Sequence, residues 1–369
     1  MKVCLKSKNL RELYPTDIVF QTEYWGKVKS RLGWKPYAFD IDTSLCREDV
    51  LVLIKSFEGN SSVAYVPQGP EIAPDEESRG IFLEALSESL AERLDSRIAF
   101  IRYDLPWMSP YAQEMNRKQW YDFPESRVRE MRMNFATRNW NLKKAPVDMT
   151  VSDSFIVRIE GTEEEILSRM KPKTRYNINL ARRKGVEVRV APVEKLPVFY
   201  RLYQETALRN GFPASEFRYF SALFSAHEKG QSDLEVVLLL ATHSRDALAG
   251  AVIAISKTRA IFLHGGSSNE KRNYMGSYAM HWEAIRYARS RQCRTYDMGG
   301  VSPSKDPGHS FFGLYRFKTG FGGDILHRSG SWDYPIDQEA YMTFRNLETL
   351  QGGKDSDTAH RLGCLHSSY

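Results

Sequence analysis

Between Phe311 and Asp324 the chain places five aromatic rings, four glycines and two fixed positive charges in fourteen positions. This stretch constrains the fold because a buried, unpaired ammonium such as that of Lys318 is very costly. One interpretation places Lys318 at the floor of a cleft, where the glycines let a ligand approach and the lysine stabilises negative charge on a reacting group. The other is a strand whose Lys318 and Arg316 extend to solvent.

The length of 369 residues allows two compact domains. The four cysteines are far apart and include no CxxC pair, which indicates reduced thiols and argues against a zinc site or a disulfide framework. No segment approaches the ~20 apolar residues of a membrane span, and the N-terminus has no signal-peptide core. We therefore expect a cytoplasmic protein without a metal or another cofactor.

Hydrophobic periodicity predicts an α/β protein with two related units. The first unit is expected to contain strands at 37–41, 51–57, 63–66 and 98–103, with a helix over 75–94. The second is expected to contain strands at 155–159, 186–191, 234–242, 248–256, 260–263 and 294–298, with helices at 172–185, 194–210, 217–224 and 276–291. A last strand is expected within 311–324, followed by a mostly helical segment after about Gly330 and a mobile tail at 351–369. The shared order of strands, helix and strand suggests a structural repeat.

Two segments are strongly basic. Residues 113–146 interleave arginines and lysines with aromatic residues, which is typical either of nucleic-acid binding or of a solvated connecting region. The densest positive charge lies between Glu165 and Glu187, where no acidic residue interrupts it. This second patch predicts either attraction to phosphate or a solvated helix face.

A glycine-rich turn between a strand and a helix, at 260–291, could bind an anion at the start of the helix. Arg272 and Gly276 are placed where a phosphate or carboxylate would meet that helix. Acyltransferases of the GNAT type use such a turn for pantetheine pyrophosphate. The sequence contains neither a GxSxG elbow nor a Ser/His/Asp order, so a covalent acyl-enzyme is not indicated. His264 and Asp297 are further candidates, each of which has a purely structural alternative.

Several local patterns occur in one order along the chain. They are WKPY at 34–37, AYVPQGP at 64–70, MKPKTRYNI at 170–178, the run at 264–284, and GLYRFKTGFGG at 313–323. Together they resemble the FemABX family of bacterial non-ribosomal peptidyltransferases, and the resemblance covers nearly the whole chain. The chain has no long heptad insertion, so it is similar to the compact, arm-free type.

The resemblance implies an α/β (α+β) fold with two tandem GNAT-like acyltransferase domains and a cleft between them. The first would comprise residues 1–153 plus 331–369 and bind the precursor; the second would comprise 154–330 and face aminoacyl-tRNA. The implied activity moves an amino acid from aminoacyl-tRNA to an amine of a peptidoglycan stem peptide. The precursor would be lipid-linked or UDP-linked, which adds peripheral contact with the inner membrane surface. The donated amino acid, the acceptor amine and the oligomeric state stay open.

The resemblance also implies roles for single residues. Lys318, with Phe317, would stabilise the tetrahedral intermediate or the tRNA terminus. The substrate-binding set is Lys35, Arg218, Tyr219, His264, Ser267, Tyr315 and Arg316. The tRNA- or phosphate-binding set is Lys171, Lys173, Arg175, Arg182, Arg183, Arg272 and Gly276. His264 stands where the family usually has tyrosine, so the acceptor pocket is expected to differ.

Two other functions compete with aminoacyl transfer. A GNAT-like N-acyltransferase would use an acyl-thioester on another amine and would bind acyl-CoA at the 264–277 turn. A non-catalytic RNA- or anionic-glycan-binding protein would use the basic surface at 113–184 and bind with a strong salt dependence.

Overall fold

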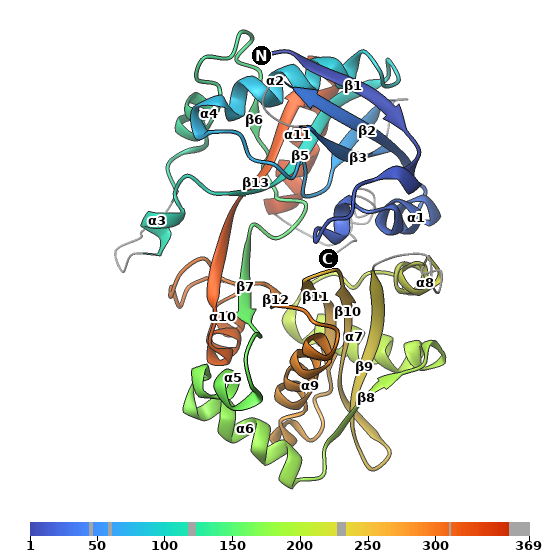
Figure 1. Cartoon of the computed structure of the whole chain (residues 1–369), viewed down its shortest axis with the longest axis vertical. Coiled ribbons are helices and arrows are strands. Elements are labelled where there is room, and N and C mark those ends of the chain that lie inside the picture. Colours follow the sequence, from blue (N-terminus) through green and yellow to red (C-terminus); the bar gives the residue numbers. More distant parts are fainter. Residues whose placement is uncertain (44–46, 58–60, 117–122, 227–233, 310, 354–369) are drawn as a thin grey trace. The chain divides into compact units, whose positions relative to one another are not determined.

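A computed structural model of the chain describes residues 1–43, 47–57, 61–116, 123–226, 234–309 and 311–353. These residues form two compact units. The first comprises Met1–Ser152 and the segment that begins at His327, and the second comprises Asp153–Leu326. Each unit has its own sheet and its own hydrophobic core (Figure 1). No helix in the described part of the chain is long and apolar enough to cross a membrane.

The sheet of the first unit has four antiparallel strands followed by a parallel one. Its strands are β1 (Val3–Lys8), β2 (Lys35–Thr43), β3 (Arg47–Ser56), β4 (Ser62–Val66), β5 (Ile98–Met108), β6 (Lys143–Lys144) and β13 (Asp324–Pro335). β1 to β4 pair in sequence order, β5 pairs parallel with β4, and β13 pairs antiparallel with β5. Helix α2 (Arg79–Ala91) connects β4 to β5, as a parallel pair requires.

Helix α2 packs its apolar side chains on this sheet, and Phe82, Leu83, Leu86 and Leu90 join the core. The remaining helices of the unit are α1 (Glu23–Arg31), α3 (Ala112–Met115), α4 (Ser126–Met133) and α11 (Gln338–Gly353). Short 3-10 turns lie at Leu10–Glu12, Val19–Gln21 and Glu76–Ser78.

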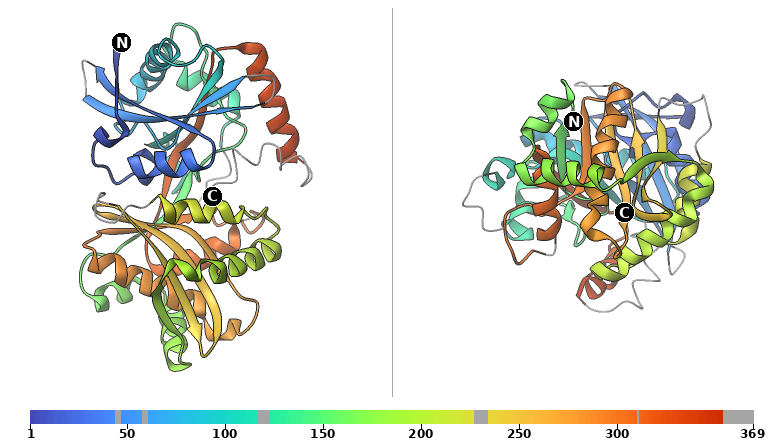
Figure 2. Two further views of the ribbon diagram at one scale, coloured as in Figure 1. Left: turned by 90° about the vertical axis from the view of Figure 1, so that its right-hand side faces the viewer. Right: turned by 90° about the horizontal axis from the view of Figure 1, so that it is seen from below.

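A buried ion network attaches the C-terminal helix α11 to the sheet. Arg102 on β5 donates to both carboxylate oxygens of Asp333 on β13, at 2.7 and 2.8 Å, and to both of Glu348 on α11, at 2.6 and 2.9 Å. All three side chains are at most 2% exposed. Because the guanidinium is shared between two carboxylates in a dry core, α11 is held beside β5 (Figure 2).

The second unit repeats the strand order of the first. Its strands are β7 (Asp153–Arg158), β8 (Glu187–Ala191), β9 (Glu235–His243), β10 (Asp246–Ile255), β11 (Arg259–Ser267) and β12 (Thr295–Gly300). β8 to β11 pair antiparallel in sequence order, β12 pairs parallel with β11, and β7 pairs antiparallel with β12. The predicted relationship between the two units is therefore confirmed at the level of topology.

Helices cover both faces of this second sheet. They are α5 (Glu163–Arg169), α6 (Pro172–Arg183), α7 (Leu196–Asn210), α8 (Phe217–Ser225), α9 (Gly276–Ser290) and α10 (Phe312–Lys318), with 3-10 turns at Val193–Lys195, Arg272–Tyr274 and Thr319–Phe321. Alternate positions of β10 face opposite helices: a Cβ at Gly250 would meet Phe199 of α7, whereas Ala249 and Ala251 share a core with Met280 of α9. The nearly continuous apolar run of β10 is what burial on both faces requires.

Two secondary-structure predictions are wrong. The stretch at 311–324 is not a strand, because helix α10 and a 3-10 turn occupy it up to Phe321. Phe312 and Tyr315, three residues apart, stack with their planes at 7°, which is a helical spacing. The segment after Gly330 is not helical at first either, since β13 continues to Pro335 and pairs with β5. Residues 354–369 of the expected tail lie outside the described residues.

Candidate functional site

The parallel strands β11 and β12 stop pairing before either strand ends. Their register runs from Arg259 opposite Thr295 to Ile261 opposite Asp297, yet β11 continues to Ser267 and β12 to Gly300. Gly299 then takes a left-handed conformation, with φ of 73°. Backbone groups beyond the last pair must find other partners, because unpaired buried groups are costly. The strand divergence thus opens the sheet within the second unit.

Lys318 lies at this divergence. It is the last residue of α10, only 5% exposed, and its Nζ donates a hydrogen bond of 2.5 Å to the carbonyl oxygen of Gly300. In the described part of the chain this is the one hydrogen bond of the ammonium, which has three protons to donate. The lysine therefore does not extend into bulk solvent. Two of its N–H donors are not used by other described residues, although in this conformation Lys318 is nearly as enclosed as Tyr219 and His264.

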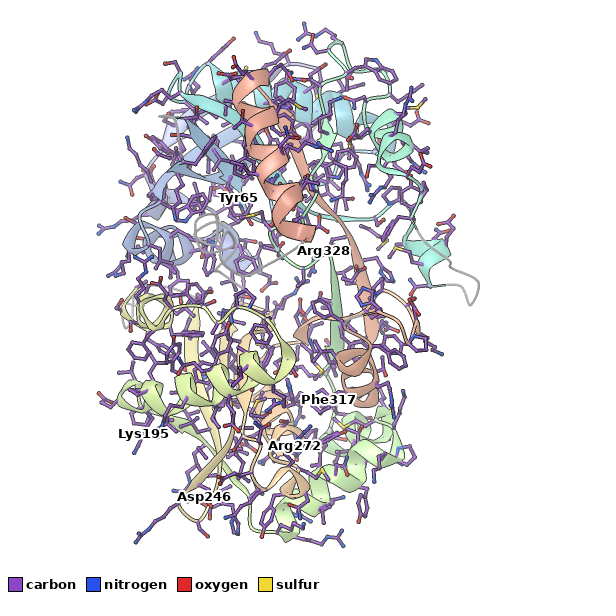
Figure 3. The ribbon with its side chains drawn as sticks, turned by 180° about the vertical axis from the view of Figure 1, so that it is seen from behind. Tyr65, Lys195, Asp246, Arg272, Phe317 and Arg328 are labelled. Atoms are coloured by element: carbon purple, nitrogen blue, oxygen red, sulfur yellow. The ribbon has the colours of Figure 1, made fainter. Side chains whose placement is uncertain are left out.

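Aromatic rings pack around Phe317, the residue before Lys318. Phe317, labelled in Figure 3, makes edge contacts with Tyr278 of α9 at 4.9 Å and with Phe321 at 5.4 Å. His281, also on α9, lies 5.4 Å from the Phe317 ring. These contacts fix the end of α10 against α9. Phe317 therefore packs against α9 next to Lys318, and these contacts give it a structural role.

Burial and one neighbouring carboxylate determine the charge of Lys318. Burial lowers the pKa of Lys318 to about 8, and the nearby Asp297 carboxylate works in the opposite direction. Asp297 is itself held, because it accepts hydrogen bonds from Ser154 at 3.2 Å and from the backbone of Gly299 at 2.8 Å. His281 is kept neutral, since burial and the Lys318 charge lower its pKa to about 3. At neutral pH the site therefore presents the Lys318 cation near the Asp297 carboxylate and a neutral imidazole.

The glycines after Lys318 do not leave room for a ligand. A Cβ at Gly322 would lie 2.2 Å from the carbonyl oxygen of Arg169, and one at Gly323 would lie 2.1 Å from that of Ile156. Gly322 also has φ of 74°, which disfavours other residues. These glycines let the chain cross close to the backbone of its own unit. The prediction that these glycines let a ligand approach is therefore wrong for Gly322 and Gly323.

Tyr219 and His264 are placed together, but inside the protein. The Tyr219 hydroxyl lies 2.9 Å from His264 Nε2, and the two side chains belong to residues 3% and 4% exposed. The rings of Tyr203 and Phe220 pack edge-on against His264. Burial lowers the pKa of His264 to about 3, so the imidazole is neutral. In this conformation neither side chain is accessible, which corrects the expectation of a cleft open to Tyr219.

The turn after β11 is filled by the protein's own groups. Glu205 of α7 accepts a hydrogen bond of 2.5 Å from the backbone of Asn269. Ser267 is bound by Arg209, whose guanidinium donates to the Ser267 hydroxyl at 2.9 Å and to its carbonyl at 3.0 Å. A carboxylate therefore already occupies part of the region expected to hold an anion.

Gly276 and Arg272, which flank the start of α9, have different environments. A Cβ at Gly276 would meet the Cβ of Leu248 at 2.8 Å, so this glycine permits close packing of α9 on β10. Arg272, labelled in Figure 3, is exposed within a 3-10 turn. Only the arginine remains available to an external anion.

The basic patch at 171–184 separates into structural and available cations. Arg175 donates to the carbonyl oxygen of Met170 at 2.5 Å, and Lys171 donates to Thr319 at 3.1 Å. The exposed members on α6 are Lys173, Arg182 and Arg183. Tyr176, 51% exposed, lies between Lys173 at 5.0 Å and Arg183 at 5.8 Å from its ring centre. This face of α6 combines an open aromatic ring with positive charge.

The remaining predicted substrate residues lie on surfaces. Lys35 begins β2 of the first unit and is exposed, with its ammonium 5.1 Å from the Tyr37 ring. Arg218 is exposed on α8 and pairs with Glu216 at 2.6 Å. On α10, Arg316 is exposed and Tyr315 is half-buried. Their binding roles stay predictions.

The sequence reasoning missed a buried carboxyl group in the first unit. Asp104 on β5 is 2% exposed and accepts a hydrogen bond of 2.5 Å from the Tyr65 hydroxyl and another from the Ser331 hydroxyl. Burial raises the pKa of Asp104 to about 6. The available signal was an acidic residue within the apolar run Ile98–Trp107, where only a satisfied carboxyl group is tolerated.

The repeated strand order, with a divergent parallel pair in the second unit, defines a tandem GNAT-like protein. A matching solved structure is FemX, with a TM-score of 0.70 and 18% identity over 91% of this chain and 96% of that one. A tandem GNAT protein from the clavulanic acid pathway gives a TM-score of 0.50 at 9% identity, covering 90% of this chain and 98% of that one. At such identities the likeness establishes the fold alone.

The family follows from the sequence. The model of the FemAB family matches residues 11–245 and 239–349, and the chain belongs to that family. The chain is 24% identical over 246 residues to a protein named lipid II:glycine glycyltransferase from Staphylococcus epidermidis, covering 51% of this chain and 59% of that protein. It is 22% identical over 258 residues to the Staphylococcus aureus protein of that name, covering 53% and 61%. The chain thus spans about 60% of the length of these curated relatives.

Proposed function

We propose that this protein is an aminoacyltransferase that moves an amino acid from aminoacyl-tRNA to an amine of a peptidoglycan precursor. The observation that carries the proposal is the buried ammonium of Lys318 at the divergence of β11 and β12. Both features belong to one unit of the fold. Lys318 and the two strands therefore lie at defined positions relative to one another within the second unit.

The aminoacyl ester is already activated, so positioning the amine and stabilising the oxyanion would supply most of the rate acceleration. The precursor amine attacks the ester carbonyl carbon, a C–N bond forms, and the ester C–O bond breaks. A proton leaves the amine and reaches the ribose oxygen of the tRNA. Negative charge develops on the carbonyl oxygen in between, and Lys318 has two N–H donors for it beyond the one bound to Gly300. A preorganised cation in a dry site stabilises such charge more than it would in water.

The surface of α6 supports a nucleic-acid donor. Tyr176 offers an open ring on which a base can stack, and Lys173 and Arg183 on either side attract phosphate. Arg182 adds a third exposed cation on the same helix. Lys171 and Arg175 would act indirectly, by fixing the start of α6 to its neighbours.

The names of the relatives support a lipid-linked precursor as acceptor, because the staphylococcal proteins are called lipid II:glycine glycyltransferases. Lys35 of the first unit would contact the precursor's diphosphate. A contact of Arg218 with the precursor stays a prediction. A cytoplasmic location and a peripheral contact with the inner membrane surface stay predictions.

An acyl-thioester donor is less well supported. The pantetheine pyrophosphate of such a donor would have to approach the turn at 264–277. There the Glu205 carboxylate already accepts the Asn269 backbone N–H, and Arg209 is already engaged by Ser267, so neither group is free to bind a pyrophosphate. The geometry therefore favours a donor whose phosphates bind elsewhere.

The test is transfer of a labelled amino acid from charged tRNA to purified lipid-linked precursor by the purified protein. We expect labelled precursor to accumulate, and ribonuclease treatment of the donor to abolish the reaction. A parallel reaction with acyl-CoA should give no product. Absence of transfer from every aminoacyl-tRNA, or transfer that persists after ribonuclease, would overturn the proposal.

A further inference from the structure

A cavity of about 80 Å³ lies in the first unit, between α4, the end of β5 and β13. It contains no residue of the Lys318 site. Among the described residues that line it, five are cationic: Arg79, Arg129, Arg132, Lys144 and Arg328. Arg328, labelled in Figure 3, lies on β13 and is 6% exposed. Such a concentration of positive charge in a small cavity is unfavourable unless an anion balances it.

The carboxylates of the cavity are already engaged. Asp148 accepts hydrogen bonds from Lys144 at 2.6 Å and from the backbone of Ser331 at 2.7 Å. Glu76 forms an ion pair with Arg132. These two acids therefore engage Lys144 and Arg132, two of the five cations.

Among the described residues, the hydrogen bonds of Arg79 and Arg129 go to neutral acceptors. Arg79 donates to the carbonyl oxygen of Met108 at 3.1 Å, and Arg129 donates to the Ser126 hydroxyl at 3.2 Å. The Nε atoms of both arginines are buried and have no hydrogen-bond partner among the residues that the structure describes. Burial lowers the pKa of Arg79, and Arg132 adds to the effect against the pull of Glu76. Two guanidinium groups thus have donors to offer inside the cavity.

Aromatic rings hold the three guanidinium groups. Arg79 lies 5.7 Å from the centre of the Trp107 ring, Arg129 lies 5.3 Å from Phe123, and Arg132 lies 5.4 Å from Tyr111. A guanidinium stacked on a ring keeps its edge free for bidentate hydrogen bonds to an oxyanion. The planar, ring-supported arrangement is preorganised, which reduces the entropy lost when an anion binds.

We propose that this cavity is a binding site for a phosphate group. Phosphate has the charge and the number of oxygens to accept from several guanidinium groups at once, which a carboxylate matches less well. The phosphate can belong to a soluble ligand or to a lipid headgroup. Three exposed apolar side chains are next in sequence to lining residues: Met108 is 58%, Val128 50% and Met131 53% exposed. They suit a phosphate carried by an amphiphile.

Calorimetric titration with inorganic phosphate, against sodium chloride at equal ionic strength, tests the site in the full chain. We expect saturable binding that Arg129→Gln weakens tenfold or more. Arg127→Gln is the matched control, because Arg127 is exposed on the same helix and does not line the cavity; it should change binding less than twofold. If Arg129→Gln lowers the unfolding midpoint without phosphate, Arg132→Gln, at an exposed position, replaces it. No saturable binding in the wild type, or equal weakening by both variants, would overturn the site.

Cosedimentation with vesicles distinguishes the two sources of phosphate. Phosphatidylcholine vesicles with and without phosphatidic acid are compared for the wild type, Arg129→Gln and Arg127→Gln. Binding that needs phosphatidic acid and Arg129 assigns the site to a lipid headgroup. Phosphate binding without vesicle binding assigns it to a soluble ligand. Vesicle binding that both variants weaken equally belongs to general surface charge and contradicts the proposal.

Discussion

The ammonium group of Lys318 donates a 2.5 Å hydrogen bond to the carbonyl oxygen of Gly300, the residue at which β12 ends. The contact joins the last residue of a helix to the end of a strand that has already left its parallel neighbour. A cation is thereby fixed beside backbone that still pairs with β7 but no longer pairs with β11.

Activity should decline as the pH rises through the pKa of Lys318. Burial lowers this pKa to about 8, so the cation is lost well below the usual 10.5 of lysine. We expect the ratio of wild-type to Lys318→Arg single-turnover rates to fall above about pH 8, since arginine stays charged. Over the same range the unfolded chain binds more protons than the folded one, so this group makes the folded protein more stable as the pH rises. A rate ratio independent of pH would show that Lys318 does not act as the cation.

Gly299→Ala should lower the rate of transfer in protein that is still folded. Its Cβ would lie 3.3 Å from the carbonyl oxygen of Phe262 and 3.9 Å from Lys318 Nζ, at a φ of 73°. Displacing a catalytic group by a fraction of an ångström can cost about tenfold or more in rate. Gly313→Ala is the control, because a Cβ there meets nothing within 4 Å. Equal rates in the two variants would argue against precise placement of Lys318.

His264→Phe should destabilise the protein by about 1–3 kcal/mol at neutral pH, because the buried Tyr219 hydroxyl loses its partner. The pKa of His264 is lowered to about 3, so between that value and 6.5 the unfolded chain takes up a proton that the folded one does not. Wild-type stability therefore falls with acid through this group, and the deficit of the variant should shrink. Urea unfolding at several pH values measures it; a deficit that grows toward acid would contradict the assignment of a neutral His264.

Arg102→Met should be among the most damaging substitutions in the first unit. It leaves Asp333 and Glu348 as buried carboxylates without their shared cation. Breaking such a network costs about 3–5 kcal/mol. The free energy of unfolding by urea measures the loss, and α11 should become protease-sensitive first. Glu339→Gln, in the exposed first turn of α11, provides the comparison and should change stability little.

The sequence was sufficient for the α/β class and the repeated order of elements, because apolar runs such as that of β10 are local signals. It was insufficient at 311–324, where a strand was expected but the helix that ends at Lys318 is found. Local pattern does not reveal that Gly322 and Gly323 pack against the backbone of Arg169 and Ile156.

The candidate site was predicted only in part, because a local pattern does not reveal tertiary packing. Lys318 stood out because a lysine among rings needs a partner, and it is indeed buried at Gly300. Tyr219 and His264 were expected at an open pocket, but whether an aromatic helix face is buried depends on tertiary packing with Tyr203 and Phe220. The cavity proposed to bind phosphate is lined by residues of α2, α4, β6 and β13, which lie far apart in sequence, so no single segment of the sequence indicated it.

The most direct test of the central claim is the single-turnover rate of aminoacyl transfer by Lys318→Met, with urea unfolding of the same preparation. Methionine keeps much of the stem packing and removes the charge, so stability at pH 7 should be unchanged or higher while the rate falls about a hundredfold or more. A rate within a fewfold of wild type in a folded variant would contradict the role of this buried ammonium.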